Sequence, residues 1–136
     1  MTLVDSNVLL DVVTDRQSWA DWSVRQLERA AANGPLVIND IVYAEISTRH
    51  ASVDAVDSIL RDLHIEVAPI PHPALFLAGK AYLRYRGAGG MRTGALADFF
   101  IGAHAAVEQL PLLTRDTQRY RTYFPTVVLI APESDA

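Results

Sequence analysis

The sequence contains no cysteine, which excludes disulfides, zinc–thiolate sites and cysteine nucleophiles. The fold must therefore rest on packing alone, as suits a reducing compartment, and we expect a cytoplasmic protein. No stretch approaches the roughly 18 uncharged apolar residues that a membrane-spanning helix needs, so no membrane association is expected. The N-terminus has no basic region and reaches an acid at Asp5, so no signal peptide is expected either.

An excess of basic charge is also missing. The formal net charge of −4 at pH 7 excludes a uniformly basic nucleic-acid coat protein, but it leaves room for a local basic patch. Residues 80–121 supply such a patch, because they hold seven basic and three acidic side chains. With 136 residues, 50% of them hydrophobic and only 21% charged, the chain is predicted to form one folded domain with a substantial core.

Short apolar runs alternate along the chain with segments of helical periodicity. The predicted strands cover residues 2–5, 36–38, 64–70, 111–113 and 126–130. The predicted helices cover residues 8–13, 19–33, 41–51, 53–63, 73–86, 96–109 and 117–124. This alternation predicts a single three-layer α/β/α domain, with a roughly five-stranded parallel sheet buried on both faces. We expect the domain to span residues 1–131 and the tail, residues 132–136, to be frayed.

Two acids lie at or just beyond the carboxyl ends of predicted strands. Asp5 ends the first strand, and Asp116 comes shortly after the strand that holds Leu112 and Leu113. Open α/β sheets bind ligands in the crevice beyond the carboxyl ends of their strands, so both carboxylates are predicted to face that crevice. The alternative is that each acid only caps the helix that follows it.

Two further acids lie on predicted helices where a carboxylate is unexpected. Glu45 falls inside the apolar stripe of its helix, where an unpaired charge is costly, although Arg49 lies one turn away and is a possible salt-bridge partner. Asp98 lies in the first turn of an almost wholly apolar helix, where the helix N-terminus alone could stabilise it. Gly102 and Ala105 share its face and leave room for another group to approach.

Four carboxylates that converge at one end of a parallel sheet would repel one another unless a cation lies among them. Oxygen ligands without cysteine or histidine select Mg²⁺, with Mn²⁺ as a possible substitute. Such a metal lowers the pKa of a bound water and offsets the charge of a phosphodiester under attack. Metal-dependent phosphodiester hydrolysis is therefore the predicted chemistry.

Four ordered motifs resemble those of PIN-domain nucleases. They are Asp5–Leu10 (DSNVLL), Tyr43–Ile46 (YAEI), Ala97–Ala105 (ADFFIGAHA) and Leu113–Asp116 (LTRD). Their order and spacing, together with the chain length, are most similar to the VapC-type toxin ribonucleases of bacterial toxin–antitoxin pairs. Each motif alone is a weak signal, whereas the ordered set covers essentially the whole chain.

This resemblance implies a function and a set of site residues. It implies an endoribonuclease that needs Mg²⁺ or Mn²⁺, with Asp5, Glu45, Asp98 and Asp116 as metal ligands and catalytic acids. Thr114 matches the small polar residue that the family places two positions before its last acid. The resemblance further implies a five-stranded parallel sheet, a homodimer, and inhibition by a small antitoxin protein.

Three arginines near these acids are candidate RNA ligands. Arg86 and Arg92 flank the glycine-rich segment 87–90 ahead of Asp98, and Arg115 directly precedes Asp116. The planar guanidinium donates two parallel hydrogen bonds to a phosphate, so we expect phosphate contacts from this cluster. The alternative for each arginine is a solvated surface charge.

Two tryptophans and a histidine complete the candidates. Trp19 and Trp22 are three residues apart and share one helix face, which predicts either core packing or an anchor for the antitoxin. His104 lies on the apolar helix, and we expect a structural role for it.

Two other function classes remain open. An aspartyl-phosphate enzyme of the haloacid dehalogenase type needs Asp-x-Asp after the first strand, where this chain has Asp5-Ser6-Asn7. A receiver domain needs a lysine at a late strand end, whereas the single lysine, Lys80, falls within a predicted helix. The second class is a non-catalytic binding module, in which the acids only cap helices.

Overall fold

The computed structural model of the protein describes residues 1–14, 18–92 and 95–132. The strands are β1 (Thr2–Val4), β2 (Leu36–Asn39), β3 (Ile65–Ala68), β4 (Leu112–Leu113) and β5 (Leu129–Ile130). The helices are α1 (Ser6–Val13), α2 (Ala20–Asn33), α3 (Asp40–Ser47), α4 (Val53–Asp62), α5 (His72–Gly87), α6 (Ala95–Glu108) and α7 (Gln118–Tyr123). Most of the predicted frayed tail, residues 133–136, lies outside the described residues.

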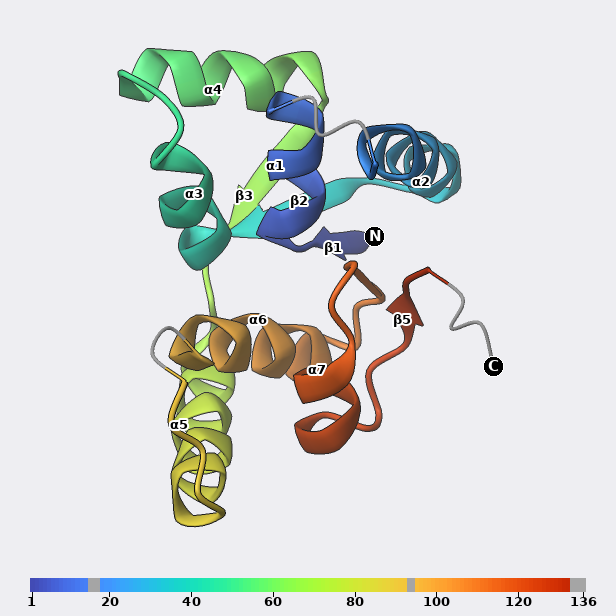
Figure 1. The fold of residues 1–136 in the computed structure, drawn as a ribbon. Helices are drawn as coiled ribbons and strands as arrows, with labels where there is room; N and C mark the ends of the chain where they lie inside the picture. Colours follow the sequence, from blue (N-terminus) through green and yellow to red (C-terminus); the bar gives the residue numbers. More distant parts are fainter. Residues whose placement is uncertain (15–17, 93–94, 133–136) are drawn as a thin grey trace.

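The five strands form one sheet in the order β3-β2-β1-β4-β5, and every neighbouring pair is parallel. Helices α1–α4 cover one face of this sheet, and α5–α7 cover the other (Figure 1). The predicted three-layer α/β/α architecture with five parallel strands is therefore confirmed. None of the helices in the described ranges is long and apolar enough to cross a membrane.

The strand order places a topological switch point between β1 and β4. From β1 the chain adds β2 and then β3 on one side, and it later adds β4 and β5 on the other side. Both strands are fully buried, and Val4 pairs with Leu113. Ligands bind at such switch points, beyond the carboxyl ends of the strands. Asp5 and Thr114, which follow these two strands, are thus brought side by side.

Several element boundaries differ from those predicted. The third strand was predicted over residues 64–70 but ends at Ala68, because Pro69 and Pro71 have no N–H to continue a ladder. The first helix was predicted over residues 8–13 but begins at Ser6. Asp5 is its N-cap, and the Asp5 side chain accepts a hydrogen bond from the Ser6 N–H.

The space beside Gly102 is filled from within the protein, so the prediction that it admits an approaching group was wrong. A Cβ at this position would lie 2.4 Å from the Phe124 ring and 3.0 Å from the Tyr120 ring. Gly102 therefore lets α7 and the residue that follows it pack directly on α6. This packing brings Tyr120, which is 2% exposed, into the protein interior near Asp5.

Candidate active site

Asp5 is the most deeply buried acid of the candidate site, with 3% of its surface exposed. Its Oδ1 accepts a hydrogen bond from the Ser6 N–H at 2.7 Å. Its Oδ2 accepts hydrogen bonds from the Thr114 hydroxyl and the Tyr120 hydroxyl, both at 2.8 Å. The carboxylate is therefore fixed in orientation by groups from three separate segments of the chain.

The environment of Asp5 opposes its ionisation. Burial raises the pKa of Asp5 to about 6, although the hydrogen bonds from Tyr120 and Thr114 act to lower it. The charge of Asp98 contributes a further increase in this pKa. A carboxylate whose pKa is raised by burial and by a neighbouring acid is typical of a functional site rather than of a simple helix cap.

Glu45 is connected to Asp5 through Ser6, whose hydroxyl contacts both carboxylates. Its Oε1 accepts a hydrogen bond from the Ser6 hydroxyl at 2.9 Å, so α3 is joined to the first turn of α1. The alternative salt bridge to Arg49 is not formed, because none of the ion pairs between described residues includes Glu45. Partial burial raises the pKa of Glu45, and the charges of Asp5 and Asp98 raise it further.

Asp98 reaches the same region from α6, in the opposite helix layer. Arg119 donates to its Oδ2 from Nε at 3.0 Å and approaches it with Nη2 at 2.8 Å. Burial raises the pKa of Asp98, while the hydrogen bond and charge of Arg119 act to lower it. The charge of Asp116 raises the same pKa, and that of Arg92 lowers it, so both residues lie within electrostatic range of Asp98.

Asp116 differs from the other three acids because it is exposed. Its backbone N–H donates to the Thr114 hydroxyl at 3.1 Å, which fixes the turn after β4. Within the described ranges its carboxylate accepts no hydrogen bond. Asp116 is thus at the rim of the site, while Asp5 is at its base.

The donor set fits a hard divalent cation in its chemistry. Asp5, Glu45 and Asp98 supply only oxygen ligands. The charge of Asp98 raises the pKa of Asp5, and the charges of Asp5 and Asp98 raise that of Glu45, which a cation among them would relieve. In the described part of the chain, no three Asp, Glu or His side chains converge on one point as a finished metal shell. Arg119 offsets the charge of Asp98 in this arrangement.

Two contributors to the site were not identified from the sequence. Tyr120 donates to Asp5, and Arg119 pairs with Asp98, from adjacent positions on α7. Arg119 belonged to the basic segment that the sequence revealed, but nothing in the pattern distinguished it from Arg121. The sequence did offer one signal for both residues, because Arg119 and Tyr120 follow Asp116 by only three and four positions.

Arg115 is engaged within the protein rather than projecting into solvent. It forms a two-pronged ion pair with Asp11, which is 1% exposed, with an Nη2–Oδ1 distance of 2.8 Å. Its guanidinium also lies 5.0 Å from the centroid of the Trp19 ring. The expectation of an arginine devoted to phosphate must therefore be modified, because two of its donors hold α1 against the turn after β4.

The other two predicted RNA ligands, Arg92 and Arg86, differ in their distance from the acids. Arg92 is exposed, and its charge acts on Asp98. Arg86 is exposed in the last turn of α5, where it lines a surface hollow together with Phe76 and Lys80. The structure thus brings Arg92, but not Arg86, into electrostatic contact with the acids.

The two tryptophans meet at the start of α2. Trp19 is the N-cap residue, Trp22 lies in the first turn, and both are half-buried. Their rings pack edge to face with centroids 5.9 Å apart, as expected for residues that share a helix face. Arg115, the residue before Asp116, links Trp19 to Asp11 of α1.

His104 joins α6 to the start of α3. Its Nδ1 lies 3.2 Å from Nδ2 of Asn39, whose Oδ1 accepts a hydrogen bond from the Val42 N–H. Since the amide nitrogen can only donate, Nδ1 is the acceptor and the ring proton resides on Nε2. Burial lowers the pKa of His104, in keeping with a neutral structural residue.

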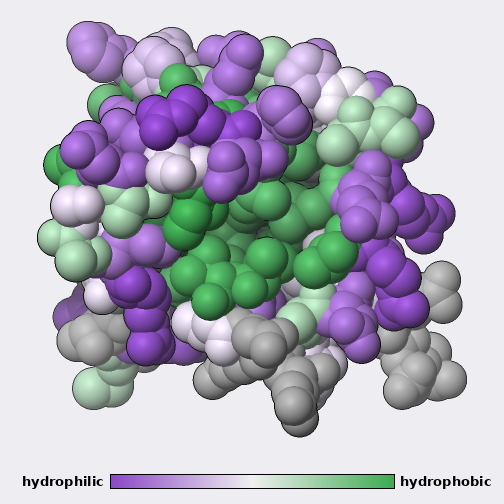
Figure 2. All heavy atoms as spheres, turned by 90° about the horizontal axis from the view of Figure 1, so that it is seen from above, coloured by the Kyte–Doolittle hydropathy of each residue, from purple (hydrophilic) through white to green (hydrophobic). Residues whose placement is uncertain are grey.

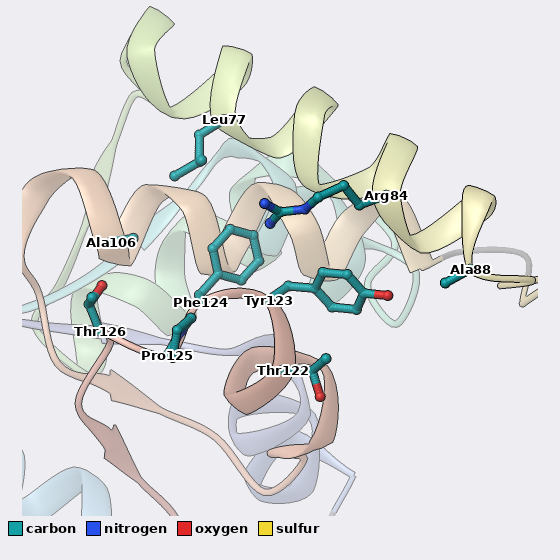
Figure 3. A pocket seen from close by; sticks show the side chains of 9 residues that line it. All are labelled: Leu77, Arg84, Ala88, Ala106, Thr122, Tyr123, Phe124, Pro125 and Thr126. Carbon is teal, nitrogen blue, oxygen red and sulfur yellow. The ribbon is translucent and has the colours of Figure 1, made fainter.

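A hollow of about 550 Å³ between α5, α6 and α7 lies apart from the acids (Figure 3). Arg84 of α5 extends over the ring of Tyr123, with 6.0 Å between its guanidinium carbon and the ring centroid. None of the residues lining this hollow is acidic. The carboxylates, and not this hollow, define the candidate active site.

Comparison with protein-family models identifies the fold family directly. The PIN domain model matches residues 2–125, which include all four motifs and all four acids. The chain belongs to the PIN domain family. A comparison with curated proteins gives no match.

Solved structures support the PIN assignment of the fold. The chain is similar to a chain of VapBC2 from Rickettsia felis bound to a promoter DNA fragment, with a TM-score of 0.74 and 19% identity over 97% of this chain and 98% of that one. It is similar to VapBC-1 from nontypeable Haemophilus influenzae, with a TM-score of 0.70 and 15% identity over 96% of both chains. It is also similar to DNA-bound VapBC from Salmonella typhimurium, with a TM-score of 0.69 and 15% identity over 96% of this chain and 98% of that one.

Proposed function

We propose that this PIN domain is a divalent-metal-dependent endoribonuclease and that it acts as the toxin of a toxin–antitoxin pair. The observation that carries the proposal is that Asp5, Glu45 and Asp98 lie within electrostatic range of one another at the switch point of a parallel sheet, with raised pKa values and only oxygen donors. If these acids only capped helices, Glu45 of one helix layer and Asp98 of the other would have no reason to lie near the same strand end.

The residues of the site have separable roles in this proposal. Asp5, Glu45 and Asp98 would hold Mg²⁺ or Mn²⁺, with Asp116 contributing at the rim. The chemistry supplied by such an ion is a bound water of lowered pKa and positive charge against the phosphate. Thr114 and Tyr120 fix the orientation of the Asp5 carboxylate, and Ser6 does the same for Glu45.

Arginines around the acids provide the attraction for RNA. Arg92 is exposed beside Asp98, and Arg119 already donates to that carboxylate. Either guanidinium is placed to contact a phosphate that approaches the site. Arg86 contributes only at a greater distance, through the positive charge of segment 80–121.

The aspartyl-phosphate alternative lacks support in the structure. Its catalytic lysine would have to reach the acids from a strand end. Lys80, the only lysine of the sequence, lies within α5, is exposed, and has its ammonium 5.3 Å from the centroid of the Phe76 ring.

An antitoxin is the proposed protein partner. The similar structures from Rickettsia felis and Salmonella typhimurium are VapBC complexes. Figure 2 looks onto the α1–α4 layer and shows apolar side chains gathered in a hollow at the centre of this face, with polar side chains around them. Incompletely buried apolar residues on this layer include Leu10, Val12 and Val24. Together with Trp19 and Trp22 they offer an apolar anchor for a partner segment.

The nuclease activity is tested with purified protein, total RNA and either Mg²⁺ or Mn²⁺, followed by mapping of the new RNA ends. We expect cleavage that chelation abolishes and that Asp98→Asn, Asp5→Asn and Glu45→Gln each largely remove. The matched control is Asp54→Asn, which alters an exposed acid in the first turn of α4. Cleavage at the wild-type rate by Asp98→Asn would show that the acids are wrongly assigned.

The toxin role is tested separately from the nuclease activity. We expect the adjacent open reading frame to encode a small protein with a DNA-binding N-terminus and an apolar C-terminal segment. Co-expression should give a stable complex in which tryptophan fluorescence shifts and RNA cleavage falls. A protein that is active, harmless to its host when overproduced and without such a neighbour contradicts the toxin role, but not the nuclease activity. The homodimer that the family resemblance implies is checked separately, by sedimentation of the isolated chain.

A further inference from the structure

A further hollow, with a mostly polar lining, lies between α1, the end of α3 and the turn after β4. It has a volume of about 460 Å³, within the range of roughly 300–1,000 Å³ typical of ligand sites. It is lined by Asn7, Leu10, Asp11, Thr14, Arg49 and Arg115. Leu10 is the only apolar member of this lining, so the hollow is suited to a polar or charged occupant.

Asn7 connects this hollow to the catalytic acids. Its Nδ2 lies 3.2 Å from the Thr114 hydroxyl and 3.5 Å from Oδ2 of Asp5. Its Oδ1 accepts a hydrogen bond from the Arg115 N–H at 3.2 Å. The Asn7 side chain thus lies between the hollow and the Asp5 carboxylate, so an extended ligand at Asp5 would continue into the hollow.

Arg49 is placed to bind that continuation. It lies four residues beyond Glu45, in the turn after the end of α3, and it lines the hollow together with Asn7. Its side chain is exposed at the hollow, and it forms no hydrogen bond or ion pair with any side chain in the described ranges. Arg115 shares the wall, but its charge is largely offset by Asp11.

The acids consequently lie between two arginines on one side and a third on the other. Arg92 and Arg119 act on Asp98 from the α6–α7 side. Arg49 lies on the α1–α3 side, beyond Glu45 and Asn7. A strand of phosphates that crosses a cation held by the acids would meet positive charge both before and after the site of cleavage.

We propose that the hollow at Arg49 binds a backbone phosphate of the RNA and that Arg49 is its principal ligand. This phosphate neighbours, on the same strand, the phosphate at which the RNA is cleaved. The RNA then runs from Arg92 and Arg119 across the acids to Arg49. This inference rests on the proposed ribonuclease function and adds a residue, Arg49, that the sequence offered only as a salt-bridge partner for Glu45.

The test measures binding of a short polyuridylate strand as a function of KCl concentration, with Ca²⁺ as the divalent ion and strand integrity checked on a gel. Loss of one phosphate contact should lower the magnitude of the salt slope of Arg49→Ala by about 0.7, which is about a five-fold loss of affinity near 0.1 M salt. Arg49→Lys, which keeps the charge, should retain most of the slope.

The matched control is Arg61→Ala. Arg61 is also exposed, but it lies in the last turn of α4 shortly before β3, and thus at the opposite edge of the sheet from the acids. We expect this variant to bind like the wild type, and thermal melts should show all three variants folded.

The outcomes distinguish the inference from the proposed function. If the wild type binds and cleaves RNA but Arg49→Ala has an unchanged slope, the hollow is not on the RNA path and an acidic segment of a protein partner becomes its better occupant. An equal loss in Arg61→Ala would also overturn the inference, because the effect would then be one of net charge. A wild type that binds and cleaves no RNA overturns the proposed function itself.

Discussion

Asp5 combines two properties that oppose each other in the protein without a metal. Its carboxylate accepts hydrogen bonds from Ser6, Thr114 and Tyr120, yet burial holds its pKa at about 6, above the ordinary value of 3.8. Between these two values the folded state binds more protons at Asp5 than the unfolded state does. The ionisation of Asp5 therefore lowers the free energy of unfolding as pH rises through this interval.

Replacing this acid should remove this pH-dependent loss of stability from the metal-free protein. Asp5→Asn keeps the shape and one acceptor oxygen for the Ser6 N–H and removes the buried charge, but its amide nitrogen cannot accept from the Thr114 and Tyr120 hydroxyls as Oδ2 does. Relative to the wild type, we therefore expect the variant to gain about 1–3 kcal/mol in the free energy of unfolding between pH 4 and pH 7. Denaturant unfolding in a chelating buffer at both pH values measures the difference. Asp54→Asn is the exposed control. A difference in stability between the variant and the wild type that is the same at both pH values would contradict the raised pKa.

Tyr120 has a role that can be separated from packing. Its hydroxyl hydrogen bond acts to lower the pKa of Asp5, so Tyr120→Phe should raise that pKa further while it keeps the ring against Gly102. We expect the acidic limb of the pH–rate profile for RNA cleavage to move upward by about one unit. Tyr82→Phe, on α5, is the control. An unmoved acidic limb would show that Tyr120 only fills space.

At the scale of elements, the sequence predicts the positions of the acids better than their partners. Asp5 could be placed because a short apolar run ends at it, and Asp98 because it interrupts an apolar helix. The order of strands could not be read from the same pattern, since β4 pairs with β1 and not with β3, the strand before it in the chain. The C-terminal end of β3 at Ala68 could be explained by Pro69 only once the pairing of β3 was known.

The partners of the acids depend on contacts between elements that are distant in sequence. Tyr120 reaches Asp5 across 115 positions, and it does so because α7 packs on Gly102 of α6. No local pattern of residues encodes that approach. The sequence indicated that Gly102 leaves space, but it did not indicate that a ring from the same chain takes it.

Gly102 is therefore predicted to control the geometry of the site from a distance. In Gly102→Ala the new methyl group would lie 2.4 Å from the Phe124 ring, so α7 must shift away from α6. We expect a loss of about 1–3 kcal/mol in the free energy of unfolding, together with reduced cleavage because the Tyr120 hydroxyl retreats from Asp5. Gly79→Ala is the control, because nothing lies within 4 Å of a Cβ at that position on α5. Equal stability of the two variants would contradict the close packing.

At the scale of the whole molecule, the site joins the two helix layers across the edge of the sheet. Glu45 comes from the α1–α4 layer, Asp98 comes from the α5–α7 layer, and Asp5 ends the central strand between them (Figure 1). In the metal-free protein, Arg119 offsets only one of these three charges directly. A cation shared by all three would oppose their repulsion and fasten the layers together.

Divalent metal should consequently stabilise the fold as a whole, and more strongly as pH rises. A ligand present at about 100 times its dissociation constant adds about 2.7 kcal/mol to the free energy of unfolding. Because the acids must be deprotonated to bind the metal, and the pKa of Asp5 is about 6, we expect a large rise in melting temperature with Mg²⁺ near pH 7.5 and a small one near pH 5. KCl at equal ionic strength separates binding from screening. Asp98→Asn should lose most of the effect, because it removes one of the three ligands. If KCl reproduced the effect, or if Asp98→Asn retained it, the acids would be helix caps and the chain a binding module without a metal centre.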